Sequence, residues 1–119
     1  MSGSDARDCD AILAFTTVDS ADRAAQIAEA LVRERLAACV SLLPSVTSIY
    51  RWKGAVHRES EVLLLIKTTQ GRVGELATWI DANHPYDVPE FLCVDATYGG
   101  DDYLAWLREA TWQKGSGKA

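Results

Sequence analysis

The sequence predicts an α+β fold of the split βαβ, ferredoxin-like type, in which two helices cover one face of an antiparallel sheet and a further helix follows. Three observations lead to this prediction. Apolar runs and helix-like periodicity alternate in the order β-α-β-β-α-β, a tight turn joins the two middle strands, and no linker divides the 119 residues. We therefore expect one domain over residues 10–113, a disordered N-terminal tail over residues 1–9 and a C-terminal tail over residues 114–119.

The first half of the chain is predicted to form a strand, a helix and a long strand. Residues 11–18 are an apolar run typical of a strand, and Asp19 or Ser20 can cap the helix that follows. Apolar residues recur at three- and four-residue spacing over residues 22–36, which predicts a helix with one buried face. The next strand contains Pro44, which marks an edge or a bulge because proline donates no hydrogen bond to a sheet.

A hairpin turn is predicted at Lys53 and Gly54, since glycine adopts the positive φ that a two-residue turn needs. The returning strand, residues 55–69, is much longer than the usual five or six residues. Its first half is polar on both faces and its second half is apolar on both faces. The hairpin is therefore expected to protrude beyond the core of its own domain.

A protruding hairpin exposes unpaired backbone groups along its edges, and pairing with another subunit covers them. Tyr50 and Trp52 are predicted to lie at this interface between subunits, because so small a core cannot bury both of them together with Trp79. The alternative is an isolated, twisted hairpin that faces solvent and carries its own charges.

The second half of the chain is predicted to form a helix, a strand and a last helix. Thr68 or Thr69 is expected to cap the helix over residues 71–83. A strand over residues 90–98 follows, and residues 100–112 have the pattern of a helix with acidic residues at its positive end.

Composition excludes several classes of protein. A net charge of −5, a pI near 4.9 and the absence of a basic run argue against a nucleic-acid partner. No apolar run approaches the roughly 18 residues of a membrane span. Cys9, Cys39 and Cys93 are odd in number and widely spaced, which favours a reducing compartment, by default the cytoplasm.

Three stretches in order resemble the CutA family of divalent-cation tolerance proteins: "LAACVSLLPSVTSIYRWKGAVHRESEVLLLIKTT", "HPYDVPEFL" and "DYLAWL". The match covers about residues 11–108. The resemblance implies a ferredoxin-like protomer that assembles as a homotrimer through its long hairpin strands, similar to the PII signalling proteins. It also implies a role in metal-ion tolerance, copper binding in some members, and no established catalytic activity.

The segment "NHPYDVPEF", residues 83–91, holds the candidate metal ligands. A metal site needs two or more convergent ligands. Copper-binding members of the family place Cys where Phe15 stands and His where Asn83 stands, so His84 alone remains of that set. We expect no obligatory cofactor and weak or conditional binding of copper or another divalent metal by His84 with Glu90, or by symmetry copies in a trimer. The alternative is a loop histidine that hydrogen-bonds locally or faces solvent.

Five residues are candidates for a cleft between subunits. They combine acidic, basic, thiol and phenol side chains: Cys39, Glu59, Glu61, Lys67 and Tyr86. The two glutamates and Lys67 share one face of the long strand, where they line a cleft between subunits or blunt an exposed edge. Cys39 is interpreted as a small buried hydrophobe, with a ligand or redox role as the alternative, and Cys93 is predicted to lie in the core.

An enzyme is not predicted, because neither His57 nor His84 has the local signature of a nucleophile with its base, and no Gly-rich phosphate loop is present. The sequence predicts a cytoplasmic, homotrimeric CutA-like protein that takes part in the response to divalent metal ions. The alternative is a PII-like signalling or scaffold module that binds a small molecule or a protein partner in the clefts between subunits.

Overall fold

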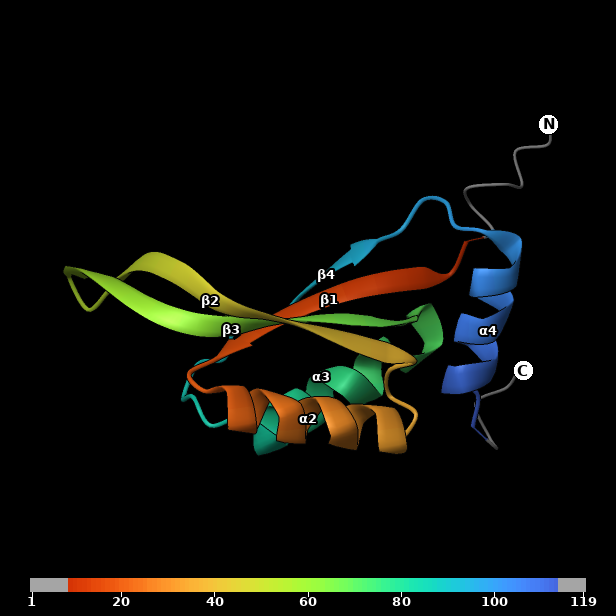
Figure 1. The fold of residues 1–119 in the computed structure, drawn as a ribbon, viewed down its shortest axis with the longest axis horizontal. Helices are drawn as coiled ribbons and strands as arrows, with labels where there is room; N and C mark the ends of the chain where they lie inside the picture. Colours follow the sequence, from red (N-terminus) through yellow and green to blue (C-terminus); the bar gives the residue numbers. More distant parts are fainter. Residues whose placement is uncertain (1–8, 114–119) are drawn as a thin grey trace.

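The computed structural model of the protein describes residues 9–113, so the predicted tails lie outside the described residues except for Cys9. The elements follow the predicted order (Figure 1): β1 (Ala11–Val18), α2 (Ala21–Arg33), β2 (Cys39–Trp52), β3 (Ala55–Thr69), the 3₁₀ helix η1 (Gln70–Arg72), α3 (Val73–Asn83), β4 (Leu92–Asp95) and α4 (Asp101–Thr111). The strands form one antiparallel sheet in the order β2-β3-β1-β4. Helices α2 and α3 lie on one face, and α4 lies at one end of the sheet. This confirms the predicted α+β class.

Helix α2 is capped at both ends. Ser20 is the N-cap, because its side chain accepts a hydrogen bond of 3.1 Å from the backbone N–H of Arg23. At the other end Arg35 adopts a left-handed φ of 60°, and the N–H of Leu36 donates to the carbonyl of Leu31 at 2.9 Å. This is a Schellman motif. It ends α2 at Arg33, three residues before the predicted end of the helix.

The hairpin of β2 and β3 has the predicted register, with Trp52 opposite Ala55. Its turn residues Lys53 and Gly54 have φ values of 52° and 83°, as a two-residue turn requires. The register shifts between Leu43 and Val46, so the predicted bulge lies at Pro44. The pairing of β1 with β3 ends at Val18 and Val62, and the part of β3 before Val62 pairs with β2 alone. The hairpin therefore projects past the rest of the sheet (Figure 1).

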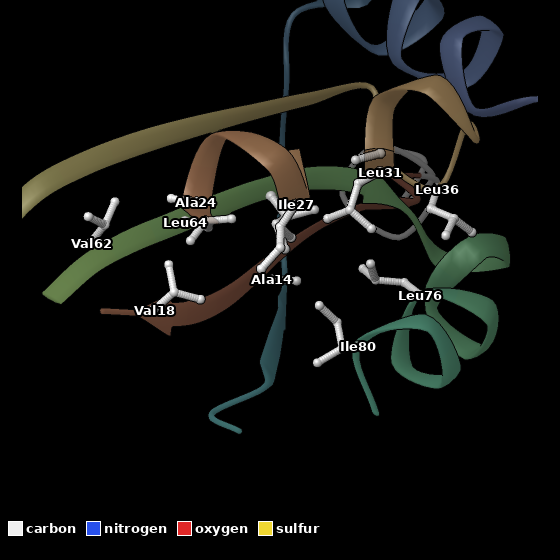
Figure 2. Close-up of a cluster of buried hydrophobic side chains, with 12 residues drawn as sticks. Ala14, Val18, Ala24, Ile27, Leu31, Leu36, Val62, Leu64, Leu76 and Ile80 are labelled. Carbon is white, nitrogen blue, oxygen red and sulfur yellow. The ribbon is translucent and has the colours of Figure 1, made fainter. Parts of the chain in front are cut away.

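The core lies between the sheet and the two helices that cover it (Figure 2). Its largest fully buried apolar side chains are Leu31, Leu64, Ile66, Leu76, Ile80 and Val18. They come from α2, β3, α3 and β1, so burial of these side chains fixes both helices against the same face.

Within residues 9–113, none of the helices has the length and apolar character that a membrane span requires.

Thr16 is the one fully buried hydroxyl of the described residues without a hydrogen-bond partner. Thr16→Val replaces that hydroxyl by a methyl group of similar size and removes an unsatisfied polar group. We expect the free energy of unfolding to rise by about 1 kcal/mol in urea denaturation. Thr68 is equally buried, but its hydroxyl donates to the carbonyl of Leu36 at 2.7 Å. Thr68→Val is therefore the control and should lower stability; the same sign for both variants would contradict the argument.

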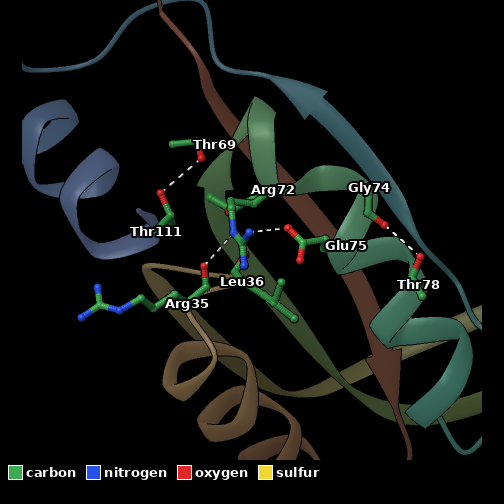
Figure 3. A network of polar contacts seen from close by, with 9 residues as sticks. Arg35, Leu36, Thr69, Arg72, Gly74, Glu75, Thr78 and Thr111 are labelled. Carbon is green, nitrogen blue, oxygen red and sulfur yellow. Dashed lines mark hydrogen bonds and ion pairs between the residues drawn. The ribbon is translucent and has the colours of Figure 1, made fainter. Parts of the chain in front are cut away.

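A buried guanidinium connects the turn after α2 to the start of α3 (Figure 3). Arg72 is 4% exposed, its Nε donates to the carbonyl of Arg35 at 3.1 Å, and it forms an ion pair with Glu75. Nearby, the hydroxyls of Thr69 and Thr111 are 3.2 Å apart. The predicted threonine cap is wrong, since Thr69 makes no side-chain cap bond and the chain passes through η1 before α3 begins.

The fourth strand is shorter than predicted, four residues instead of residues 90–98. It is an edge strand that pairs with β1 alone, from Ile12 to Phe15. All of its residues are exposed, Cys93 included. The prediction that Cys93 lies in the core is therefore wrong for the protomer, because an edge strand of this length has no second strand to flank it.

Candidate functional site

A cleft with a volume of about 680 Å³ lies where β1 ends and the hairpin begins to project. The segment between α3 and β4 passes beside this point (Figure 1). Five carboxylates and three aromatic side chains line the cleft: Asp19, Glu59, Glu61, Asp87, Glu90, Tyr50, Trp52 and Tyr86. No lysine or arginine is among the described lining residues. We call this site the acidic cleft.

Glu61 is the most buried carboxylate of the acidic cleft, with 8% of its surface exposed. The hydroxyl of Tyr86 donates a hydrogen bond of 2.7 Å to Glu61 Oε2. Burial and this hydrogen bond both raise the pKa of Tyr86, so the phenol remains a donor at neutral pH. The bond fixes the loop before β4 against β3 and thereby forms one wall of the cleft.

The second wall is the hairpin itself. The hydroxyl of Tyr50 donates to Glu59 Oε1 at 2.8 Å, and the Tyr50 ring stacks on His57 with ring centroids 5.4 Å apart. The hydrogen bond to Glu59 raises the pKa of Tyr50. Tyr50 and Trp52 are both exposed in the protomer, at 39% and 44%. The predicted interface aromatics therefore lie beside the acidic cleft.

His84, the predicted metal ligand, is buried at the C-terminal end of α3. Its Nδ1 accepts a hydrogen bond of 3.1 Å from the backbone N–H of Tyr86. A backbone N–H can only donate, so Nδ1 carries no proton. The proton of the neutral ring is therefore on Nε2, which donates to the carbonyl of Thr17 at 2.9 Å. Burial lowers the pKa of His84 and favours this neutral form. Thus His84 holds Tyr86 in place at the edge of the acidic cleft.

The predicted ligands His84 and Glu90 do not both line the acidic cleft. Glu90 lines the acidic cleft, whereas His84 is not among the residues that line it. Among residues 9–113, no three or more His, Cys, Asp and Glu side chains converge as metal ligands would. A metal ion at His84 would replace one of the two hydrogen bonds of the imidazole. The assignment of His84 and Glu90 as ligands stays a prediction.

The predicted cleft residues fall into two separate groups in the protomer. Glu59, Glu61 and Tyr86 lie in the acidic cleft. Lys67 lies six residues further along β3, on the order of 20 Å away at the usual strand rise. There its Nζ is 2.5 Å from Ser41 Oγ and 3.7 Å from Cys39 Sγ. Cys39 was interpreted as a small buried hydrophobe. It is only half-buried in the protomer, so the structure supports this interpretation in part.

Two acidic residues of the cleft, Asp19 and Asp87, are not among the residues that the sequence pattern indicates. Asp19 was considered only as a helix cap, but Ser20 provides the cap and Asp19 lines the acidic cleft. Asp87 follows Tyr86 in the same loop and also lines the cleft. Their positions were the available signal: Asp19 directly follows β1, and Asp87 lies in the loop that passes the end of that strand.

The face of the sheet opposite α2 and α3 is uncovered and largely apolar, although the same register also places Ser41 and Lys67 on it. Ala14, Leu64 and Ile66 belong to the core, so their neighbours along β1 and β3 point the other way. The strand register adds residues of β2 and β4 to the same face. We call this surface the open sheet face: Leu13, Phe15, Leu43, Leu63, Leu65, Leu92 and Val94.

Comparison with known proteins finds a family whose sequence pattern matches this chain. The family described as "CutA1 divalent ion tolerance protein" matches residues 12–110. This chain belongs to that family. A relative from Thermus thermophilus, "Divalent-cation tolerance protein CutA", is 50% identical over 95 residues, which cover 80% of this chain and 92% of the relative. The predicted resemblance to CutA is thereby confirmed.

Other CutA relatives differ in length. "Protein CutA, chloroplastic" from Arabidopsis thaliana is 42% identical over 84% of this chain, but the chain spans only 55% of that relative. The solved CutA1 structure from Thermus thermophilus has a TM-score of 0.83 at 47% identity and covers 86% of this chain and 99% of its own. A CutA structure from Synechococcus elongatus, complexed with a Bis-Tris molecule, has a TM-score of 0.80 at 39% identity and covers 86% of this chain and 94% of its own.

Proposed function

We propose that this chain takes part in the response to divalent metal ions as a CutA-type homotrimer with weak or conditional copper binding. The observation that carries the proposal is the acidic cleft, whose five carboxylates attract divalent cations. Copper prefers imidazole and thiolate ligands, and both nitrogens of His84 are hydrogen-bonded. Copper binding by His84 with Glu90 is therefore conditional on release of the Tyr86 N–H from Nδ1.

Calorimetric titration with Cu(II) tests the metal proposal. Wild-type protein should bind weakly, and His84→Ala and Glu90→Gln should each lower the affinity by about tenfold if these residues are the ligands. Glu29→Gln, on the exposed surface of α2, removes the same charge far from the cleft and should leave the affinity unchanged. Tight binding by wild type, or undiminished binding by His84→Ala, would place the metal elsewhere.

The trimer is supported by the open sheet face and by the hairpin. Leu92 and Val94 are 65% and 47% exposed in the protomer, and large apolar surfaces of this kind are covered in subunit interfaces. Light scattering should give about three times the 13.0 kDa mass of the chain at micromolar concentration. A stable monomer or dimer would contradict the proposal.

The proposal includes a cytoplasmic location and action by binding rather than by catalysis. Cys9, Cys39 and Cys93 are free thiols, which agrees with a reducing compartment. The Arabidopsis relative is named chloroplastic, so a plastid is the location of at least one relative. Because both ring nitrogens of His84 bond the backbone, its imidazole is not poised as a general base.

A PII-like role in binding a small molecule is the second candidate. The cleft volume of about 680 Å³ lies in the range of small-molecule sites, and its aromatic walls are typical of them. The Synechococcus elongatus relative was solved with Bis-Tris, which is a small organic molecule. A thermal-shift comparison separates the two candidates, because a metal-response protein gains stability with divalent ions and a small-molecule module gains it with organic ligands.

A further inference from the structure

The open sheet face continues into the acidic cleft. Ser48 of the cleft is paired with Glu59, and residues paired across two strands point to the same face of a sheet. Side chains alternate along a strand, so the odd-numbered residues of β3 share this face: Glu59, Glu61, Leu63, Leu65 and Lys67. The face therefore has carboxylates where the hairpin projects, leucines in its middle and an ammonium group at its other end.

Lys67 is the one lysine or arginine that the strand register places on this face within residues 9–113. It forms no ion pair among those residues, and its ammonium hydrogen-bonds to the neutral atoms Ser41 Oγ and Cys39 Sγ, at 2.5 and 3.7 Å. A subunit that covers the neighbouring leucines also removes water from this ammonium. A buried charge is costly unless an opposite charge accompanies it. Covering the open sheet face therefore favours a carboxylate of the second copy beside Lys67.

The carboxylates of the same chain are out of reach of Lys67. Glu61 lies six residues back along β3, on the order of 20 Å away at the usual strand rise. The acidic cleft itself has five carboxylates and no lysine or arginine in its described lining. Glu61 is the cleft carboxylate next to the leucines along β3, and the hydrogen bond of 2.7 Å from the Tyr86 hydroxyl holds its position. The two ends of one face are thus complementary in charge between copies and not within a copy.

We propose that Lys67 of one copy enters the acidic cleft of the next copy and forms an ion pair with Glu61 there, so that two subunits share the cleft. Leu63 and Leu65 lie between the two charges and are covered by the same contact. Each copy gives one lysine and receives one, which is a heterologous contact, and three such contacts can close into a ring. The pairing rests on the proposed homotrimer and names the residues that fix how its copies meet.

Reversal of the two charges tests the pairing. Lys67→Glu and Glu61→Lys each bring like charges together at the contact, so light scattering should show the mass falling from three chains toward the 13.0 kDa of one chain. The double variant restores opposite charges and should restore the mass. An equimolar mixture of the two single variants should associate more than either alone, because opposite charges then meet between different chains. Circular dichroism verifies that each variant is folded.

Two control variants on α2 make the same changes of charge. Arg33→Glu and Glu29→Lys lie on the exposed surface of that helix, on the other side of the sheet, and should leave the mass unchanged.

Neutral substitutions decide the question where a reversed charge unfolds the protomer. Lys67→Met and Glu61→Gln keep the size of each side chain and should each weaken the association of subunits by about tenfold or more, measured by light scattering in a urea series. Because both remove the same ion pair, the combined variant should lose clearly less than the sum of the two single losses.

The outcomes separate the pairing from the homotrimer. Wild-type protein with the mass of one chain would reject the homotrimer itself. A trimeric wild type would overturn the pairing if Lys67→Glu is folded and stays trimeric, if the folded double reversal fails to restore the mass, or if the two neutral losses simply add. In those cases the homotrimer stands and Lys67 has another partner.

Discussion

Val94→Lys is expected to dissociate the proposed trimer and leave the protomer folded. Val94 lies on β4 in the open sheet face and is 47% exposed, so a single protomer accommodates a lysine there. In a trimer the same ammonium would be buried against the apolar residues of another copy, at a cost of several kcal/mol for each subunit. Light scattering should show the mass falling toward the 13.0 kDa chain, while circular dichroism retains the signal of a folded α+β protein.

Val32→Lys is the matched control. Val32 has a similar exposure of 43%, but it lies on α2, on the other side of the sheet. The same substitution there adds the same charge and should leave the mass at three chains. If both variants remain trimeric, the open sheet face is not the interface, and the hairpin edges become the surface to test. If both dissociate, the effect comes from charge rather than from location.

Local sequence signals were sufficient for the parts of the fold that depend on neighbouring residues. Gly54 determines the hairpin turn, and the alternation of β2 and β3 then fixes which residues face one another, as at Trp52 and Ala55. The helices α2 and α4 follow from apolar periodicity and an acidic or capped first turn. The residues that determine these elements lie close together in the sequence, so one sequence is enough to predict them.

Tertiary hydrogen bonds caused the errors at the ends of the helices. Thr68 and Thr69 look like caps, but their hydroxyls bond Leu36 and Thr111, which are 32 and 42 residues away in the chain. The end of α2 depends on Arg35 in a left-handed conformation, and the Arg72 guanidinium binds its carbonyl from the start of α3. No local pattern indicates such partners.

The candidate site was predicted only in part, because it also depends on contacts between residues that are distant in the sequence. Glu59 and Glu61 were recognised because the period of a strand places them on one face. Their convergence with Asp19 and Asp87 depends on where the loop before β4 crosses the end of β1, which one sequence does not determine. His84 was recognised as a residue of interest, but its burial and both of its partners required the structure.

His84→Ala is expected to lower the free energy of unfolding by about 2–4 kcal/mol at pH 7, because it leaves the buried carbonyl of Thr17 and the N–H of Tyr86 without partners. Chemical denaturation measures this. The loop that carries Tyr86 should also loosen, which weakens the hydrogen bond from the Tyr86 hydroxyl to Glu61. His57→Ala is the control, since His57 lies on the projecting hairpin and only stacks on Tyr50. A loss below about 0.5 kcal/mol for His84→Ala would contradict the structural role of the imidazole.

Comparing the pH dependence of the stability of wild-type protein and of His84→Ala identifies the protonation state of the His84 imidazole. Burial lowers the pKa of folded His84 below its ordinary value of 6.5, and the charge of Arg23 assists this shift. The hydrogen bond to the Thr17 carbonyl and the charges of Glu61 and Asp19 oppose it. The unfolded chain therefore binds the proton more readily, so the stabilisation from His84 is complete above pH 6.5 and is lost as the pH falls toward the folded pKa. Protonation at Nδ1 turns the acceptor of the Tyr86 N–H into a donor, which is the structural cause of the loss. Wild-type stability should thus decline just below pH 6.5, above the range near 4 where carboxyl groups titrate. His84→Ala should show a flatter profile in that interval, and an unchanged slope would assign the titration to another group.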